Sequence, residues 1–408
     1  MKKRINKVFP IGLSVLLFTN ICLYDLATIN IYIILSAITM ALIIAADIYS
    51  RCFVIKFDPC IKWLLTIYLI FETYGLLFLR YGDYNWDFQL FNCVSNIALY
   101  ICFKRIFETK NWVKTLTVSI SVSTVAIILY MIKSEFDKLT NLGLFERIGD
   151  SLSGNVNTVG ECLGVLSLLL SYLYMLNKKK KSILVLFLIT SVAMLLTGSK
   201  MTFLCIMIDL LLWLKLDKNR SMAWIKYAAL ACAVLFLIFN EPHLYNIIGE
   251  RLVAMVVQLF GKSNAVISHS TSDRIGMIVE GFKIFLTSPI YGGGEKYFAY
   301  MSPQYGHYGY SHCNYVEMLC NFGLIGTIIY YVPIIRNMKM AYEMKKTNYT
   351  LAVFVVCALI MRFVLDFMSV THSDVCINYI PMLLSFIILD KIRREDIYEQ
   401  AKNNNIFA

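Results

Sequence analysis

The chain is divided into runs of roughly 20 apolar residues, and this feature limits what it can fold into. A helical run of that length spans a lipid bilayer, because a helix rises about 1.5 Å per residue. Apolar residues make up 58% of the 408 positions and charged residues only 16%, too few to cover a soluble protein of this size. We therefore expect an all-α integral membrane protein, since an open sheet leaves its backbone unsatisfied in lipid.

Twelve segments are predicted to cross the membrane. They are residues 8–24, 29–48, 61–79, 86–103, 113–132, 157–176, 182–197, 201–216, 224–240, 313–335, 350–370 and 375–389. The seventh and eighth are separated at residues 198–200, because one helix through both would be too long for a bilayer. The predicted organisation is nine spans within 1–240, a large loop over 241–312, three spans within 313–390 and a tail over 391–408.

Basic residues predict the orientation of these spans. Most of the 38 Lys and Arg residues fall at the N-terminus and in every second connection, with the clearest cluster at 178–181. Because basic residues are enriched in cytoplasmic connections, we expect both termini to be cytoplasmic and the loop over 241–312 to lie outside. The formal net charge of +11 follows from this topology and from contact with anionic lipid, so no nucleic-acid partner is expected.

The predicted outer loop is long, which is uncommon for a loop without a function. Residues 243–260 have the periodicity of an amphipathic helix that lies on the membrane surface. Asp273 is a predicted N-cap for a second helix, from Arg274 to about Thr287. Pro289 and the glycines after it end that helix.

Histidine and tyrosine residues are concentrated in the same loop. The histidines of the predicted outer face are His243, His269, His307, His312 and His372, and the tyrosines of the loop include Tyr297, Tyr300, Tyr305, Tyr308 and Tyr310. The tyrosines either stack on sugar rings or form an aromatic belt at the membrane interface.

Three segments on the predicted outer side carry short motifs. They are residues 196–200 (LTGSK), Arg274 with the downstream 289–294 (PIYGGG), and 311–326 (SHCNYVE followed by GLIG). In order and spacing they resemble motifs of the O-antigen polymerase and O-antigen ligase family (Wzy-like and WaaL-like proteins). Those motifs are a Leu-Thr-Gly-Ser-Arg turn, an Arg–helix–Pro-x-x-Gly-x-Gly pattern, and a His-Asn-x-x-Leu-Glu pattern followed by Gly-x-x-Gly. The segment 155–157 (NVN) before the sixth span also fits, and the likeness covers about residues 150–335.

The resemblance implies glycosyl transfer at the outer face of the bacterial cytoplasmic membrane. The donor would be a glycan on polyprenyl diphosphate, the acceptor a hydroxyl of a second lipid-linked repeat unit, and the leaving group the polyprenyl diphosphate. The chain is most similar to a surface-polysaccharide polymerase, for a capsule, an O-antigen or another glycan. A ligase that uses another acceptor is the alternative. Implied partners are the lipid-linked oligosaccharide, the bilayer, a chain-length regulator and a flippase.

Departure of a diphosphate requires cations, and the planar fork of Arg matches phosphate oxygens. Arg274 is the first candidate, since a cation at a predicted helix N-terminus is slightly unfavourable and indicates another role. Lys200, which stands where the family pattern has Arg, is either a second phosphate contact or an interfacial lysine. Arg362 in the eleventh span is a third candidate, although Asp366 one turn later makes a structural ion pair an equal alternative.

His312 is the candidate general base, because an imidazole with a pKa of about 6.5 accepts a hydroxyl proton near neutral pH. The alternative is a histidine that caps or lines the start of a helix. Cys313 separates it from Asn314, unlike the His-Asn pair of the family pattern. His307 and His269 are lesser candidates.

Polar residues form stripes on two predicted spans. Asn314, Glu317 and Asn321 share one face of the tenth span, where they bind sugar and orient the base or serve as helix-packing contacts. Asn157 and Glu161 make a similar stripe on the sixth span, for which we favour packing. We predict substrate contacts at Asn314 and Glu317.

No metal or cofactor is expected. The twelve cysteines include no Cys-x-x-Cys pair, no Asp-x-Asp occurs, and residues 292–294 lack the Lys-Ser/Thr that a phosphate-binding P-loop needs. Arg and Lys can neutralise a lipid diphosphate without a metal ion.

The competing hypotheses are a transporter, such as a lipid-linked oligosaccharide flippase, and a membrane scaffold. A carrier predicts repeated halves with polar sites near the midplane, and no convincing repeat is visible. Asp209 in the eighth span is the strongest midplane charge, and the enzyme hypothesis gives it no role. A scaffold gives no reason for the placement of Arg274 and His312.

Overall fold

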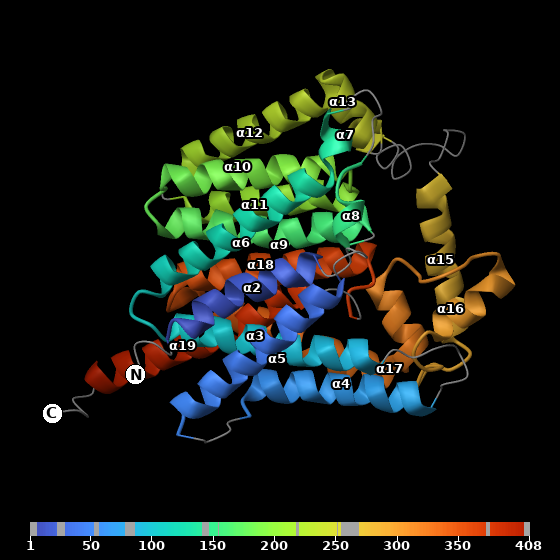
Figure 1. The fold of residues 1–408 in the computed structure, drawn as a ribbon, viewed down its shortest axis with the longest axis horizontal. Helices are drawn as coiled ribbons and strands as arrows, with labels where there is room; N and C mark the ends of the chain where they lie inside the picture. Colours follow the sequence, from blue (N-terminus) through green and yellow to red (C-terminus); the bar gives the residue numbers. More distant parts are fainter. Residues whose placement is uncertain are drawn as a thin grey trace.

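The computed structural model describes residues 6–22, 29–52, 57–77, 86–140, 147–153, 155–217, 220–250, 252–253, 269–372 and 376–403. All regular structure in these residues is helical, and no strand occurs in them. Long helices lie side by side along one direction, and a smaller group containing α15 and α16 lies at one end of them (Figure 1). The prediction of an all-α chain is confirmed.

Each of the twelve predicted spans overlaps a helix. In chain order these are α2 (Val8–Cys22), α3 (Ile29–Ser50), α4 (Pro59–Leu77), α5 (Trp86–Phe107), α6 (Trp112–Ser134), α9 (Val156–Leu176), α10 (Lys181–Leu196), α11 (Lys200–Leu216), α12 (Arg220–Asn240), α17 (Asn314–Glu343), α18 (Tyr349–Met368) and α19 (Ile380–Asn403). Seven helices in the described ranges, α3, α5, α6, α9, α12, α17 and α18, are long and apolar enough to cross a membrane by length and composition. The chain is therefore a multi-pass membrane protein, while the count of twelve and the placement of both termini stay predictions.

The remaining helices lie outside or at the edges of the predicted spans. They are α7 (Phe136–Thr140), α8 (Asp150–Ser153), α13 (Pro242–Leu244), the π-helix η3 (Tyr245–Gly249), α15 (His269–Phe285), α16 (Tyr297–Met301), and the 3₁₀ helices η4 (Ser302–Tyr305), η5 (Met344–Lys346) and η6 (Cys376–Tyr379). The expected amphipathic helix over 243–260 corresponds to α13 and η3 at its start, and its part beyond residue 253 lies outside the described residues.

The predicted start of the second loop helix is wrong. Helix α15 begins at His269, so Asp273 lies within it and is not its N-cap, and Arg274 is not at its first turn. Residues 270–273 read Ser-Thr-Ser-Asp, and each of these residue types is a good N-cap. The pattern therefore could not single out the position at which the helix begins.

Two glycines bring α9 and α11 into close contact. A Cβ atom on Gly160 would lie 2.8 Å from the Cγ2 of Thr202, and one on Gly164 would lie 2.7 Å from the Cys205 sulfur. Small residues of this kind allow membrane helices to approach closely. Asp209 is buried at the same interface, where it accepts a hydrogen bond from the Ser167 hydroxyl (2.7 Å). This places the midplane carboxylate between two helices.

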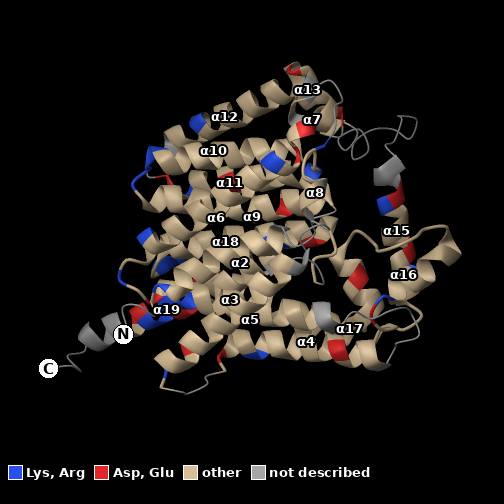
Figure 2. Cartoon of the chain, in the orientation of Figure 1, with Lys and Arg blue, Asp and Glu red and all other residues tan. Residues whose placement is uncertain are grey.

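The two ends of the bundle differ in charge. We call the end at which α11 begins the pocket end, and the opposite end, with the 178–181 turn between α9 and α10, the basic end. Among the described residues, Lys and Arg gather at the basic end, where α19 also ends (Figure 2). The positive-inside rule associates such an end with the cytoplasm.

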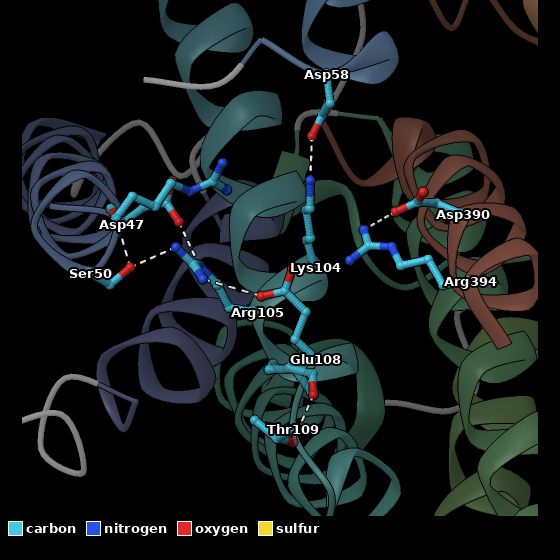
Figure 3. A network of polar contacts seen from close by, with 11 residues as sticks. Asp47, Ser50, Asp58, Lys104, Arg105, Glu108, Thr109, Asp390 and Arg394 are labelled. Atoms are coloured by element: carbon cyan, nitrogen blue, oxygen red, sulfur yellow. Dashed lines mark hydrogen bonds and ion pairs between the residues drawn. The ribbon is translucent and has the colours of Figure 1, made fainter. Parts of the chain in front are cut away.

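Ion pairs join helices at the basic end (Figure 3). Arg105 on α5 donates to Asp47 (2.5 Å) and to Ser50 (2.6 Å) on α3. Lys104 on α5 pairs with Asp58, just before α4 (2.5 Å). Each of these two basic groups is thus matched by a carboxylate from another segment.

At the pocket end, the loop over 289–294 (PIYGGG) docks on a break in α17. The break lies at Gly323, whose φ of 61° and ψ of −164° leave the helical region. The Gly293 N–H donates to the Cys320 carbonyl (2.9 Å), and the Leu324 N–H donates to the Pro289 carbonyl (2.9 Å). A Cβ at Gly323 would lie 2.4 Å from the Ile290 carbonyl oxygen, so only glycine allows the loop backbone to come this close to α17. The Pro-x-x-Gly and Gly-x-x-Gly motifs therefore meet and satisfy each other's backbone groups.

Candidate functional site

A cavity of about 360 Å³ at the pocket end gathers charged side chains from several segments. Its lining residues are Arg147, Asn157, Glu161, Ser199, Lys200, Met201, Asp273, Arg274, Met277, His312 and Met368. Three residues predicted from separate motifs, Lys200, Arg274 and His312, therefore share one cavity. The structure adds Arg147, which belongs to none of the three motifs.

Lys200 is the first residue of α11, directly after the tight turn at Gly198. Gly198 has a φ of 60°, and a Cβ there would lie 2.9 Å from the Ile247 carbonyl and 3.3 Å from the Cγ of Arg147. A larger residue would displace one of these neighbours. The LTGSK motif therefore provides a compact turn that leaves Lys200 and Arg147 beside the cavity.

Two neutral acceptors orient Arg147. Its Nε donates to the Thr197 carbonyl (2.7 Å), and its Nη2 donates to the Oδ1 of Asn157 (2.7 Å). These hydrogen bonds fix the plane of the guanidinium at the cavity, and the planar fork of an arginine matches phosphate oxygens. In the sequence, the one sign that Arg147 lies at this cavity is its position in a predicted outer connection shortly before the NVN segment.

Arg274 reaches the cavity from α15, which packs against α17. A Cβ at Gly281 would lie 2.1 Å from Val316, so α15 lies against the start of α17 at this glycine. Arg274 lies two turns before Gly281 and is half-buried. Its charge is close enough to His312 to act, after burial, as the second cause that lowers the pKa of that imidazole.

The backbone at His312 is left-handed, with a φ of 54°. Such conformations are uncommon in non-glycine residues and persist where the surroundings hold them. The flanking residues supply that hold, because the Ser311 N–H donates to Glu317 (2.8 Å) and the Cys313 N–H donates to the Ser311 hydroxyl (3.2 Å). His312 also contacts the Tyr310 ring, with centroids 4.2 Å apart.

The His312 imidazole is neutral at physiological pH. Burial, and then the nearby Arg274 charge, lower its pKa to about 4. A neutral imidazole has a lone pair that can accept a proton. An anion bound beside Arg274 would oppose that charge and raise the pKa of the imidazole.

Asn314 lies behind the cavity rather than in its wall. It is buried, and its Oδ1 accepts hydrogen bonds from the backbone N–H groups of Thr371 and His372 (3.0 Å each). The same oxygen faces Nδ1 of His372 at 2.8 Å, so Nδ1 must carry the proton. Burial lowers the pKa of His372 to about 3, which keeps this ring neutral. Because the polar groups of Asn314 are used within the protein, the geometry favours its alternative role as a packing contact over a sugar contact.

Glu317 is also buried behind the cavity, where it accepts the Ser311 N–H described above. Glu295, directly after the PIYGGG segment, lies near it and has a pKa raised to about 8 by burial and by the Glu317 charge. The Glu295 Oε1 is 4.0 Å from Nε2 of His372. Glu317 thus belongs to the structure that holds the start of α17, and it does not line the cavity as a substrate contact would.

Arg362 lies outside the cavity lining and is fully buried. It pairs with Asp366 (3.0 Å), donates to the Asn378 carbonyl (2.9 Å) and donates to the Tyr330 hydroxyl. These partners neutralise and orient it without a ligand. The structural ion pair, rather than substrate binding, agrees with this placement.

Two carboxylates also line the cavity, Glu161 and Asp273. Glu161 is buried and accepts a hydrogen bond from Asn378 (3.4 Å), whereas Asp273 is exposed. In the described part of the chain, no group of three or more His, Cys, Asp or Glu side chains is arranged to hold a metal ion. The cavity lining therefore combines three basic side chains with two carboxylates and an imidazole.

Comparison with known families supports the motif resemblance. Residues 163–331 match the family described as O-antigen ligase, and this range contains Lys200, Arg274 and His312. Comparison with curated proteins gave no match. Arg147, Asn157 and Glu161 contribute to the cavity from outside the matched range. Over the segment 163–331 and in the motifs within it, the chain is similar to the O-antigen ligase family.

Proposed function

We propose that the protein is a polysaccharide polymerase that acts on polyprenyl-diphosphate-linked glycans at the outer face of the bacterial cytoplasmic membrane. The observation that carries the proposal is the single cavity in which Arg147, Lys200 and Arg274 lie beside His312. Three basic groups suit a diphosphate, and a neutral imidazole suits a hydroxyl. A membrane enzyme with its site at the outer face can bind a donor and an acceptor that are both lipid-linked.

The proposed reaction is a displacement at the anomeric carbon of the donor glycan. The acceptor hydroxyl oxygen attacks that carbon, and the bond from the carbon to the diphosphate oxygen breaks. His312 accepts the hydroxyl proton, and the polyprenyl diphosphate leaves with the bonding electron pair. Arg147, Lys200 and Arg274 neutralise the charge that develops on the leaving oxygen. This stabilisation is the main electrostatic contribution to lowering the reaction barrier.

Asp273 is a second candidate for the base, because it lines the same cavity and is a carboxylate. The two hypotheses differ in their variants. If His312 is the base, His312→Ala loses the chemical step while Asp273→Asn retains it. The reverse pattern would assign the proton to Asp273.

Asn314 and Glu317 are, in this proposal, positioning residues. Glu317 holds Ser311, next to His312, and Asn314 holds the backbone at Thr371. A conservative Glu317→Gln change keeps an acceptor for the Ser311 N–H and should therefore retain more activity than Glu317→Ala.

A ligase is the second candidate function, because the family description that matches the chain names a ligase. Donor binding and leaving-group departure would be the same, and only the acceptor differs. The acceptor preference therefore decides between the two.

The test is a transfer assay with purified protein in lipid nanodiscs, a polyprenyl-diphosphate-linked repeat unit from the producing cell, and EDTA. A ladder of longer lipid-linked glycans that survives EDTA supports the polymerase. Transfer to a different glycolipid acceptor without a ladder supports the ligase. Absence of transfer, together with movement of the lipid across a liposome bilayer, would replace both with a transporter.

A further inference from the structure

Helix α15 has a packed face that the fold explains. Gly281 lies against Val316 of α17, and Ile284 is fully buried in a small core with Phe298 of α16. Arg274 projects from the same side into the cavity. This face therefore attaches α15 to α17 and orients Arg274.

A second face of α15 is apolar and is left exposed by the described residues. Ile275, Val279 and Phe282 on the helix, and Leu286 directly after it, are each at least 50% exposed. Their spacing of i, i+4, i+7 and i+11 places them in one narrow stripe along the helix. We call these four residues the outer stripe. A soluble loop would not expose such a stripe to water.

The outer stripe continues into the lipid-facing surface of α17. Ile290, just after α15, is exposed, and its carbonyl accepts the N–H of Ile325 (3.2 Å). From there, the exposed residues Ile325, Ile328 and Val332 follow α17, which is long and apolar enough to cross a membrane. The stripe and the membrane-facing side of α17 therefore form one apolar surface.

The direction of α15 agrees with a membrane surface. Figure 1 shows α15 running across the direction of the long helices, at the pocket end of the bundle. A helix in that direction lies parallel to the bilayer plane. Amphipathic helices that bind in this way bury their apolar face by roughly 5–10 Å at the boundary of headgroups and acyl chains.

We propose that α15 is an in-plane membrane helix whose outer stripe is seated in the acyl chains of the adjacent leaflet. The occupant is the bilayer, because the stripe is continuous with a surface that already faces lipid. Seated there, α15 holds Arg274 at the height of lipid phosphates. That consequence for Arg274 rests on the proposed function, whereas the seating of α15 does not.

The test places a tryptophan on each face of α15 and measures its contact with lipid. Phe282→Trp is on the outer stripe. Glu280→Trp is the matched control, because Glu280 lies off the stripe and its Oε2 is 3.2 Å from Nε2 of His307. The purified variants are reconstituted with lipids brominated on the acyl chains, which quench nearby indoles. The five native tryptophans give the same background in both. We expect several-fold deeper quenching of the added fluorescence at position 282 than at position 280.

Leu286→Trp serves as a second stripe position should Phe282→Trp not fold, with folding judged by size-exclusion chromatography. Equal quenching at stripe and control positions, or none at 282 and 286, would overturn the seating of α15. If the stripe is not quenched by the lipid and instead contacts another protein, the stripe is a binding surface for that partner. Because the readout is fluorescence, seating can be established even if glycan transfer is not, and a failure of the proposed function would be visible separately in the transfer assay.

Discussion

Arg105 at the basic end and Arg147 at the pocket end are held in different ways. Arg105 donates to the carboxylates of Asp47 and Glu108, whereas Arg147 donates to a backbone carbonyl and to the amide of Asn157. The carboxylate partners of Arg105 join two segments, whereas the contacts to Thr197 and Asn157 orient a guanidinium that lines a cavity with Lys200 and Arg274. Cations at the basic end therefore connect helices, whereas cations at the pocket end line one cavity, where we propose that they bind an anion.

The largest expected effect in this comparison is at His312. His312→Ala should lower kcat by roughly 10²–10⁴-fold, the usual contribution of a positioned proton acceptor. The variant should fold normally, since His312 is only half-buried at the cavity. Single-turnover transfer in nanodiscs measures the loss. A variant with normal kcat would remove His312 from the chemistry.

The ion pair of Arg362 should behave as structure. Arg362→Met leaves the Asp366 carboxylate buried without its cation and should destabilise the protein by about 3–5 kcal/mol. The double change Arg362→Met with Asp366→Leu should recover most of that loss, measured as the midpoint of thermal unfolding. Recovery of stability without recovery of activity would return Arg362 to the substrate site.

Arg274→Lys tests whether the guanidinium of Arg274 makes a bidentate contact with the diphosphate. The variant keeps the charge and loses bidentate contact, which we expect to cost roughly 1.5–3 kcal/mol of transition-state stabilisation, or about 10- to 150-fold in kcat/KM. Arg105→Lys is the matched control at the basic end, where kcat/KM should not change. Equal losses at both positions would erase the distinction between the two ends.

The pH profile gives a smaller effect with a definite sign. His312 must be unprotonated to accept a proton, and its pKa is lowered to about 4, so kcat/KM should stay level from pH 7 to pH 5 and fall as the pH drops through about 4. A histidine with an ordinary pKa of about 6.5 would already have lost about 10-fold at pH 5.5. An inflection near 6.5 would contradict the burial of His312 and, after it, the close placement of Arg274.

The smallest effect is expected for Lys391 at the basic end. Its pair with Glu395 (3.2 Å) is a partly exposed i,i+4 contact on α19. Lys391→Ala should change stability by less than about 0.5 kcal/mol and leave transfer activity unchanged. A marked loss of activity would show that this end of the bundle contributes to function.

Sequence alone predicted the helices well, because an apolar run of bilayer length has few structural alternatives. It also singled out Lys200, Arg274 and His312, each from a motif of its own, and the structure brings all three to one cavity, where their roles stay predictions. It did not single out Arg147, because that residue has no motif and its place depends on a contact with Thr197, fifty positions away.

The polar stripe on the tenth span shows the limit of such reasoning. Periodicity placed Asn314 and Glu317 on one face, and both are buried, as expected for a stripe that avoids lipid. Periodicity could not say whether that face meets substrate or protein. The start of α15 was likewise misplaced, because several good N-cap residues are adjacent.

What the sequence by itself determined is the class of the protein, an all-α membrane chain, and the residue types available for phosphate and proton chemistry. Hydropathy and charge are properties of short stretches of sequence, so membrane-spanning segments can be predicted from neighbouring residues alone. Only the tertiary structure decided which cations pair with carboxylates between helices and which line a cavity together. That depends on the groups that lie within hydrogen-bonding distance, and those groups come from distant segments that only the packing of the helices brings together.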